Sequence, residues 1–233
     1  MKVLCIIPAR GGSKSIPKKN IRIINGYPLI KYTIDYALKS QLLNKVIVST
    51  DDSEIAEIAQ QLGAEVPFLR PSEFSADDSQ DYVVLKHALD WYDAKKCFYD
   101  YLVLLRPTSP LRKPGLIENA MNIMNLYPDA TSLRSVAKVS EHPYRMWIQK
   151  GNFISGLFEN DQLIEPYNIP RQLLPPIYFQ TGDIEVIRTS TIRNGSVSGP
   201  RILPLFIDQC YIDIDNESDL IHAASLMLKK NGS

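Results

Sequence analysis

Short apolar runs alternate along this chain with stretches in which apolar residues recur every three or four positions. Uninterrupted runs such as VLCII at residues 3–7 and YLVLL at 101–105 have the length and composition of strands buried on both faces. Runs of this kind predict strands at residues 3–7, 46–49, 65–68, 101–105 and 202–207, with a further ordered element at 177–188.

The stretches between these runs have helical period. After Asp52, a residue type that caps helices, Ile55, Ile58, Ala59 and Leu62 share one face before Gly63 ends the pattern. Comparable faces predict helices at residues 28–39, around Val84, Ala88 and Trp91, after Pro114 with Ile117, Met121 and Met124, and finally with Leu220, Ala224, Met227 and Leu228.

Strands that alternate with helices of this length predict one α/β domain of Rossmann-like, three-layer α/β/α architecture over residues 1–233, with a mostly parallel sheet. The rhythm fails at about residues 139–176, which have prolines, scattered aromatic residues and no sustained period. We expect irregular structure there, with a hairpin at Lys150-Gly151. A long irregular segment in a compact domain is usually functional or covers a partner.

Composition limits the function classes. The 26 basic and 26 acidic residues of the 233 give a formal charge of zero, which argues against a whole-surface grip on nucleic acid or membrane. No apolar stretch reaches the roughly 18 residues that span a bilayer. Cys5, Cys97 and Cys210 lack metal-ligand spacing and are odd in number. We expect buried free thiols and a cytoplasmic location.

Charge is nevertheless segregated along the chain. Residues 1–34 contain seven Lys or Arg and no acid, whereas residues 202–228 contain five acids and no Lys or Arg. The basic loop IIPARGGSKSIPKKN follows the first strand, where glycines let backbone N–H groups approach phosphate oxygens. A solvated turn is the alternative. A nucleic-acid site is less favoured because no aromatic residue interleaves the charges.

The acidic end contains Asp213-Ile214-Asp215. Residues two apart in a strand point to the same face, so both carboxylates can reach one cation while Ile214 faces the core. A small set of oxygen ligands suits Mg²⁺, which takes its other ligands from water and phosphate. The alternative is a strand end followed by a helix cap at Asn216 or Asp215.

The basic loop resembles the N-terminal signature of the acylneuraminate cytidylyltransferases, the CMP-sialic acid synthetases and their relatives for other nine-carbon keto sugar acids. Further blocks follow in the order of that family: VIVSTDDSEIAEIAQQLGAEV, LRPSEFSADDSQ, LLRPTSPLR, EHPY, IPRQ and YIDIDNESDL. The related enzymes for eight-carbon Kdo usually carry a Leu-Ala-Ser-x-Arg pattern at the loop, which this chain lacks.

The resemblance implies a Mg²⁺-dependent nucleotidyltransferase that converts CTP and a nonulosonic acid, of the N-acetylneuraminate, legionaminate or pseudaminate type, into a CMP-sugar and pyrophosphate. It implies catalytic roles for Arg10, Lys14, Lys19 and Asp213 and a metal site at Asp213 and Asp215. The nucleotide would contact Arg10, Gly11, Ser13, Lys14, Lys19, Asn20, Arg70, Ser79 and Asp81.

For the sugar acid, the resemblance implies contacts from Arg106, Thr108, Ser109, Arg145, Arg171 and Gln180. It also makes the irregular segment a small protruding dimerisation arm, which lends residues to the site of a second subunit in a homodimer. Three positions depart from the family pattern. Arg106 stands where Gln is common, Ser15 where Gly is usual, and Thr181 where Asn is customary. Arg106 leads us to expect a sugar other than N-acetylneuraminate.

Two alternatives stay open at this stage. One is a CMP-Kdo-type synthetase. The other is a non-catalytic nucleotide-binding protein that kept the fold, which the presence of Asp213, Asp215, Arg10 and Lys14 disfavours because a binding relic need not keep metal ligands.

Overall fold

The structure is a computed structural model that describes residues 1–76, 79–158, 163–208 and 212–231. It divides into two compact units, a first unit of Met1–Ser135 with Thr181–Ser233 and a second unit of Val136–Gln180. The second unit contains the segment predicted as an arm. Cys210, which we expected to be a buried thiol, lies outside the described residues.

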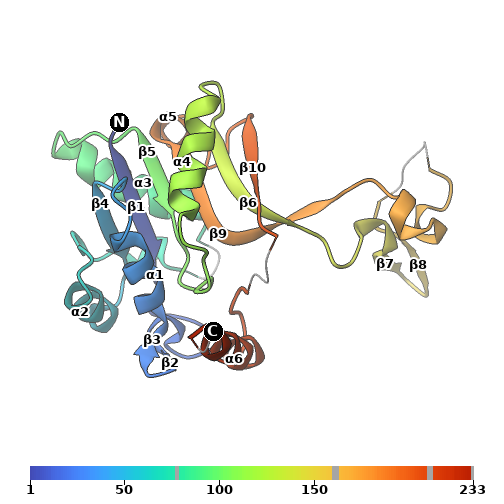
Figure 1. Cartoon of the computed structure of the whole chain (residues 1–233), viewed down its shortest axis with the longest axis horizontal. Helices are drawn as coiled ribbons and strands as arrows, with labels where there is room; N and C mark the ends of the chain where they lie inside the picture. Colours follow the sequence, from blue (N-terminus) through green and yellow to red (C-terminus); the bar gives the residue numbers. More distant parts are fainter. Residues whose placement is uncertain (77–78, 159–162, 209–211, 232–233) are drawn as a thin grey trace. The chain divides into compact units, whose positions relative to one another are not determined.

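A mixed sheet forms the centre of the first unit (Figure 1). Its strands run in the order β10-β6-β9-β5-β1-β4. Their bounds are β1 Val3–Pro8, β4 Lys45–Ser49, β5 Tyr101–Leu104, β6 Ser132–Lys138, β9 Tyr178–Arg188 and β10 Ile202–Phe206. β1 pairs in parallel with β4 and β5, whereas β9 runs antiparallel to β5. The parallel core is the part of the sheet that positions the site described below.

Helices cover both faces of this sheet. Val3, Cys5 and Ile7 of β1 pack in one apolar cluster with α1 (Leu29–Leu38), α2 (Ser53–Gln61) and α4 (Leu116–Leu126). Leu4 and Ile6 pack in a second cluster with α3 (Asp81–Ala94) and α5 (Thr189–Arg193). This alternation explains why β1 reads as a continuous apolar run. The predicted three-layer α/β/α fold with a mostly parallel sheet is confirmed.

The local signals around α2 are also confirmed. Asp52 Oδ1 accepts hydrogen bonds from the backbone N–H groups of Glu54, at 2.8 Å, and Ile55, at 3.1 Å, and so caps the helix. Gly63 has φ of +93°, a conformation that glycine adopts without a steric penalty, and it ends the helical segment as predicted.

The last helix, α6 (Glu217–Asn231), packs on a third apolar cluster beside β2 (Ile23–Ile24) and β3 (Tyr27–Pro28) (Figure 1). This cluster combines Ile16 of the basic loop with Ile214 and with Leu220 and Met227 of α6. The helix α6 therefore supports the basic loop through this apolar cluster. Leu228, which we placed on the buried face, is 62% exposed, so that assignment was wrong.

Three further expectations need correction. The run at 65–68 forms only isolated bridges, such as Ile47 with Glu65, and no continuous strand. β6 was not foreseen, because its sequence SLRSVAK carries buried serines in place of apolar residues. Cys97 is exposed, not buried, whereas Cys5 is buried as expected.

The second unit contains the predicted hairpin. β7 (Trp147–Lys150) and β8 (Phe153–Gly156) pair antiparallel, and Gly151 in the turn has φ of +64°. The remaining short elements of both units are 3₁₀ turns: η1 Lys19–Ile21, η2 Ser72–Phe74, η3 Pro143–Arg145, η4 Pro166–Asn168 and η5 Arg171–Leu173. None of the helices in the described part of the chain has the length and apolarity that a bilayer crossing requires.

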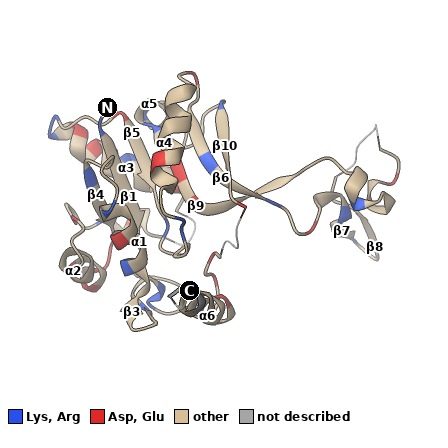
Figure 2. Cartoon of the chain, in the orientation of Figure 1, with Lys and Arg blue, Asp and Glu red and all other residues tan. Residues whose placement is uncertain are grey.

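Basic and acidic residues are interspersed over the elements of each unit (Figure 2). This distribution agrees with the zero formal charge of the chain. The basic and acidic residues that are segregated in the sequence come together at one place in the first unit, where the basic loop meets the acidic segment.

Candidate active site

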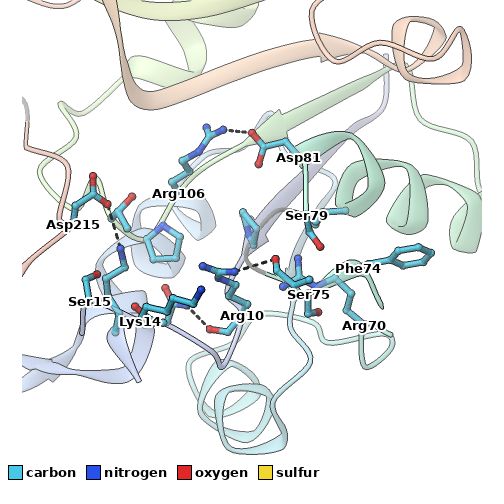
Figure 3. Close-up of a pocket in the computed structure, with 18 residues that line it drawn as sticks. Arg10, Lys14, Ser15, Arg70, Phe74, Ser75, Ser79, Asp81, Arg106 and Asp215 are labelled. Atoms are coloured by element: carbon cyan, nitrogen blue, oxygen red, sulfur yellow. Dashed lines mark hydrogen bonds and ion pairs between the residues drawn. The ribbon is translucent and has the colours of Figure 1, made fainter. Parts of the chain in front are cut away.

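A cavity of about 520 Å³ opens where β1 and β5 end (Figure 3). Open α/β sheets bind ligands at this edge. Predicted nucleotide, sugar and metal residues line it together: Arg10, Ser13, Lys14, Lys19, Asn20, Arg70, Ser79, Asp81, Arg106, Thr108 and Asp215. Pro8, Ser15, Phe74, Ser75, Ala76, Val84 and Pro107 complete the lining.

The basic loop is held by backbone contacts that leave its cations at the cavity. Gly11 donates its N–H to Asp51 Oδ1 at 3.0 Å, and Asn20 Nδ2 donates to the carbonyl oxygen of Arg10 at 2.9 Å. A Cβ at Gly11 would lie 2.6 Å from Asp52 Oδ2, so only glycine fits there. Gly11 itself does not line the cavity. It fixes the path of the loop.

The wall of the cavity beside Arg10 carries Arg70, which is only 5% exposed (Figure 3). Its backbone N–H donates to the carbonyl oxygen of Thr50 at 2.7 Å, and its Nη2 lies 3.9 Å from Asp51 Oδ1. Burial lowers the pKa of the Arg70 guanidinium, and the nearby carboxylate of Asp51 opposes that shift. Arg10 reaches the same wall through a 3.0 Å bond from Nη1 to the carbonyl oxygen of Ala76.

In the acidic segment, residues 212–215, buried and exposed side chains alternate, although the segment lies outside any strand. Ile212 and Ile214 are buried, and Asp213 and Asp215 between and after them are exposed. The backbone N–H of Ile214 donates to the carbonyl oxygen of Thr108 at 2.9 Å. Both carboxylates therefore point away from the buried isoleucines, but the strand expected at these residues does not form, and only Asp215 lines the cavity.

A separate residue caps the helix that follows. Asn216 Oδ1 accepts from the N–H of Asp219 at 3.0 Å, and Asp219 Oδ2 accepts from the N–H of Asn216 at 3.1 Å. This reciprocal pair is a capping box. The capping role thus falls to Asn216, and the Asp215 carboxylate is left for Lys19, whose Nζ lies 3.4 Å from Asp215 Oδ1.

Asp213 does not line the cavity but lies near Gly182 and Ser109. A Cβ at Gly182 would come within 3.9 Å of Asp213 Oδ2 and 3.2 Å of Ser109 Oγ. Ser109 is 1% exposed, and its Oγ has no hydrogen-bond partner within the described ranges. Burial raises the pKa of the nearby Asp183 carboxyl, and the negative charge of Asp213 adds to that rise.

Arg106 is held by two carboxylates. Its Nη1 donates to Glu185 Oε1 at 2.5 Å, and its Nη2 pairs with Asp81 at the first turn of α3. Glu185 is fully buried and also pairs with Arg134 Nη2, 3.1 Å from its Oε2. Burial opposes the charge of Arg106, but the two carboxylates outweigh it and raise the pKa of the guanidinium.

The turn that presents Arg106 is built around a second arginine. Arg112 donates from Nη2 to the carbonyl oxygen of Arg106 at 2.6 Å, from Nη1 to Thr33 Oγ1 at 2.9 Å and from Nε to the carbonyl oxygen of Asp183 at 2.5 Å. Burial lowers the pKa of Arg112 to about 10. Its donors join α1, β9 and the turn after β5, which is a structural role.

The second unit holds the remaining predicted sugar residues, Arg145, Arg171 and Gln180. Arg145 Nη2 donates to the carbonyl oxygen of Ile169 at 3.1 Å, and Arg171 Nη2 donates to that of Val139 at 2.9 Å. Arg171 also lines a cavity of about 450 Å³ within this unit. His142, expected in the arm, caps η3 there. His87 and His222 lie in α3 and α6, as expected.

Sequence reasoning missed Asp51, Phe74 and Glu185. Glu185 had a detectable signal, because a lone acid between Ile184 and Val186 in a strand pattern must either face solvent or find a buried partner. Asp51 lies in a bend after β4 and Phe74 in the 3₁₀ turn η2, and the sequence pattern specifies the course of neither segment.

Residues 4–144 match the profile of the family described as Cytidylyltransferase. The CMP-N,N'-diacetyllegionaminic acid synthase of Legionella pneumophila is 35% identical to this chain over 97% of both chains. The pseudaminic acid cytidylyltransferase of Campylobacter jejuni (serotype O:2) is 42% identical over 52% of each chain. An N-acylneuraminate cytidylyltransferase of Streptococcus agalactiae is 34% identical over 95% of this chain, which spans about half (52%) of that relative.

Two solved structures share the fold. A CMP:2-keto-3-deoxy-manno-octonic acid synthetase complexed with CTP superposes with a TM-score of 0.73 at 18% identity, covering 99% of this chain and 100% of that one. The 4-diphosphocytidyl-2C-methyl-D-erythritol synthase of Anaerococcus prevotii superposes with a TM-score of 0.65 at 11% identity, covering 97% and 96%.

Proposed function

Because this chain belongs to the cytidylyltransferase family, we propose that it transfers CMP from CTP to a nine-carbon 2-keto sugar acid of the nonulosonate class, releasing pyrophosphate. The observation that carries this proposal is the meeting of the basic loop and the acidic segment at one cavity, with Lys14 and Asp215 both in its lining. A triphosphate needs cations along its chain, and an acidic pair close by suits a bridging cation.

In this reaction the anomeric hydroxyl oxygen of the sugar forms a bond to the α-phosphorus. The bond from that phosphorus to the oxygen bridging to the β-phosphate breaks, pyrophosphate takes the electron pair, and the hydroxyl proton is lost. Arg10, Lys14 and Lys19, which line the cavity, would stabilise the charge that moves onto the pyrophosphate. Ser13 and Asn20 also line the cavity and would orient the phosphates.

The residues present fit a Mg²⁺ ion. Asp213 and Asp215 are both exposed on one side of the segment anchored by the buried Ile214. Within the described ranges, no group of three or more His, Cys, Asp or Glu side chains has metal-site geometry. Two carboxylates suffice for Mg²⁺, which keeps several waters and binds substrate phosphates. Bound there, the ion would supply Lewis-acid stabilisation of phosphoryl oxygens.

The sugar is proposed to be of the legionaminate or pseudaminate type, with N-acetylneuraminate as a further candidate. One relative that is similar over nearly the full length of both chains is a CMP-N,N'-diacetyllegionaminic acid synthase, which supports this class. Arg106 at the cavity also differs from the Gln that the resemblance leads us to expect for N-acetylneuraminate. A Kdo-type substrate is the alternative, since a Kdo synthetase shares the fold.

The test is a substrate panel. The purified chain would be incubated with CTP and Mg²⁺ and with each of N,N'-diacetyllegionaminate, pseudaminate, N-acetylneuraminate and Kdo. We expect CMP-sugar, detected by mass, and one pyrophosphate per product with at least one nine-carbon acid. Preference for Kdo would replace the proposal with its alternative, and binding of CTP without pyrophosphate release from any acid would favour a binding protein.

We also propose that the chain forms a homodimer through the second unit. Its hairpin exposes large apolar side chains, with Phe153 79% and Ile154 62% exposed. Exposed apolar clusters of this kind mark interfaces. In such a dimer, Arg145 and Arg171 would be lent to the partner's sugar site, as the family resemblance implies. A cytoplasmic location stays a prediction.

Analytical ultracentrifugation tests the dimer. The variant Phe153→Ser/Ile154→Ser should sediment as a monomer at concentrations where the natural chain is a dimer. Tyr127→Ser, which changes a side chain that is 56% exposed in the first unit, is the matched control. A natural chain that is monomeric at all concentrations rules the proposal out.

A further inference from the structure

Arg106 makes two ion pairs of very different character. The carboxylate on Nη1 belongs to Glu185, which has a side-chain exposure of 0%. The carboxylate on Nη2 belongs to Asp81, which has a side-chain exposure of 43%. Figure 3 shows the pair of Arg106 and Asp81 at the cavity. Arg106 itself is 21% exposed and lines the cavity. One pair is therefore sealed from solvent, and the other lies at the surface of the substrate cavity.

The two pairs differ in how easily they exchange. A buried carboxylate that loses its cation is left uncompensated at a large cost, so the Glu185 pair is held in place. Glu185 is also fixed by Arg134. An exposed ion pair contributes little to the free energy of folding, and solvent or another ion can replace either partner. The Asp81 pair is therefore the one that a ligand can displace.

The Asp81 carboxylate stays stabilised when it is released from Arg106. It is the first residue of α3, a helix of 14 residues, and a carboxylate in the first turn of a helix is stabilised by the exposed backbone N–H groups. Its release would leave Arg106 Nη2 facing the cavity while Glu185 holds Nη1. A carboxylate that arrives from the cavity would then restore the two-carboxylate environment of the guanidinium.

We infer that Asp81 is a stand-in for the carboxylate of the sugar acid, which displaces Asp81 from Arg106 Nη2, and that buried Glu185 is the positioning residue that aims Arg106 at it. This inference rests on the proposed function, because the ligand is taken to be a keto sugar acid. It assigns Arg106 to the carboxylate of the substrate and makes Asp81 a competitor of the substrate for that residue, in place of the nucleotide contact that the family resemblance implied for Asp81.

The first experiment separates a stand-in from a direct ligand contact. Isothermal titration with N-acetylneuraminate and N,N'-diacetyllegionaminate, in the presence of α,β-methylene-CTP, compares the natural chain with Asp81→Asn. We expect the variant to bind the sugar acid about two- to fivefold more tightly, the value of an exposed pair. Asp90→Asn, in the same helix and paired with Lys86, should change nothing. Weaker or unchanged binding by Asp81→Asn overturns the inference.

The second experiment tests Arg106 through the charge of the ligand. The natural chain should bind each acid about 10- to 100-fold more tightly than its methyl ester, as expected for a charge-assisted contact. Arg106→Gln should remove that preference, and Arg201→Gln, an exposed arginine paired with Asp129, should keep it. Retention of the preference by Arg106→Gln contradicts the inference. If Arg106→Gln fails to fold, Arg106→Gln/Glu185→Gln avoids the uncompensated carboxylate and takes its place.

The third experiment tests positioning by Glu185. Glu185→Gln should raise the KM for the sugar acid and leave the KM for CTP unchanged, and adding it to Arg106→Gln should cause no further loss, because both changes remove one interaction. Additive losses, or equal effects on both substrates, would show a merely structural role. CMP-sugar formation by the natural chain tests the proposed function by itself, so the two failures are distinguishable.

Discussion

Lys19 donates from Nζ to the backbone carbonyl oxygen of Ile214 at 2.8 Å, joining two positions that are 195 residues apart in the chain. The same Nζ lies 3.4 Å from Asp215 Oδ1. One lysine of the basic loop thus fixes the acidic segment that is proposed to hold Mg²⁺. This contact holds the basic N-terminal part and the acidic C-terminal part of the sequence next to each other.

The contact between Lys19 and Ile214, which we call the tether, predicts that Lys19→Met lowers both stability and turnover. Loss of a partly buried charged hydrogen bond should lower the free energy of unfolding by about 1–3 kcal/mol, and turnover should also fall, because a cation is lost at the cavity. Denaturant unfolding and steady-state kinetics measure the two effects. Lys18→Met is the matched control. Lys18 is the neighbour of Lys19 in the loop, but its side chain is 61% exposed and pairs with Glu54 at the surface. Equal effects of both variants would refute the tether.

Removal of one carboxylate of the proposed Mg²⁺ site should strongly reduce catalysis without unfolding the chain. Asp213→Asn should reduce kcat by about 100-fold or more, the size of losses seen when a positioned charge-stabilising group is removed. The affinity for Mn²⁺, read by its electron paramagnetic resonance signal, should fall as well. Asp129→Asn, at a side chain that is 83% exposed, controls for net charge. Full CMP-sugar synthesis in excess chelator would contradict the metal requirement.

Two adjacent glycines in the basic loop should respond differently to alanine. A Cβ at Gly11 would lie 2.6 Å from Asp52 Oδ2, whereas a Cβ at Gly12 would meet nothing within 4 Å. Gly11→Ala should therefore destabilise the protein by about 1–3 kcal/mol through overpacking against the cap of α2, and Gly12→Ala should be close to neutral. Thermal melts measure both, and similar melting temperatures for the two variants would show that the loop adjusts.

The two described thiols should differ in reactivity and pH dependence. Burial raises the pKa of Cys5 to about 12 from 9.0, whereas Cys97 is exposed. Iodoacetamide at pH 8, followed by peptide mass mapping, should label Cys97 and spare Cys5. The folded chain keeps the Cys5 proton where the unfolded chain releases it. This stabilising contribution is intact below about pH 9 and disappears as the pH rises through about 12. Cys5→Ala should lose that part of the alkaline slope.

Periodic apolar positions were sufficient to predict the core of the fold. In β1 the residues 3–7 alternate between two apolar clusters, and in α2 the cap at Asp52 and the glycine at 63 agree with the helical period. Local and long-range signals coincide in these elements. Residue patterns alone could therefore locate the cavity edge and bring Arg10 and Lys14 to it.

Two of the misses share a physical cause, which is burial of polar groups through long-range partners. β6 carries Ser132 and Ser135, which are buried and bonded to Ser198 and Ile184. Glu185 is fully buried because Arg106 and Arg134 reach it from other elements. The strand pattern around Glu185 indicates that a buried acid there needs a partner, but it does not indicate which residues pair with it, because they lie far away in sequence.

The packing of α6 against the basic loop has a consequence for the order in which the protein folds. Ile16 of the loop is buried against Ile214, Leu220 and Met227, which lie far later in the chain. Contacts between residues so distant in sequence form late, because a large loop must close before they are made. The parallel strands can therefore pair before the basic loop gains its apolar support, and we expect the proposed nucleotide site to be completed in a late step of folding.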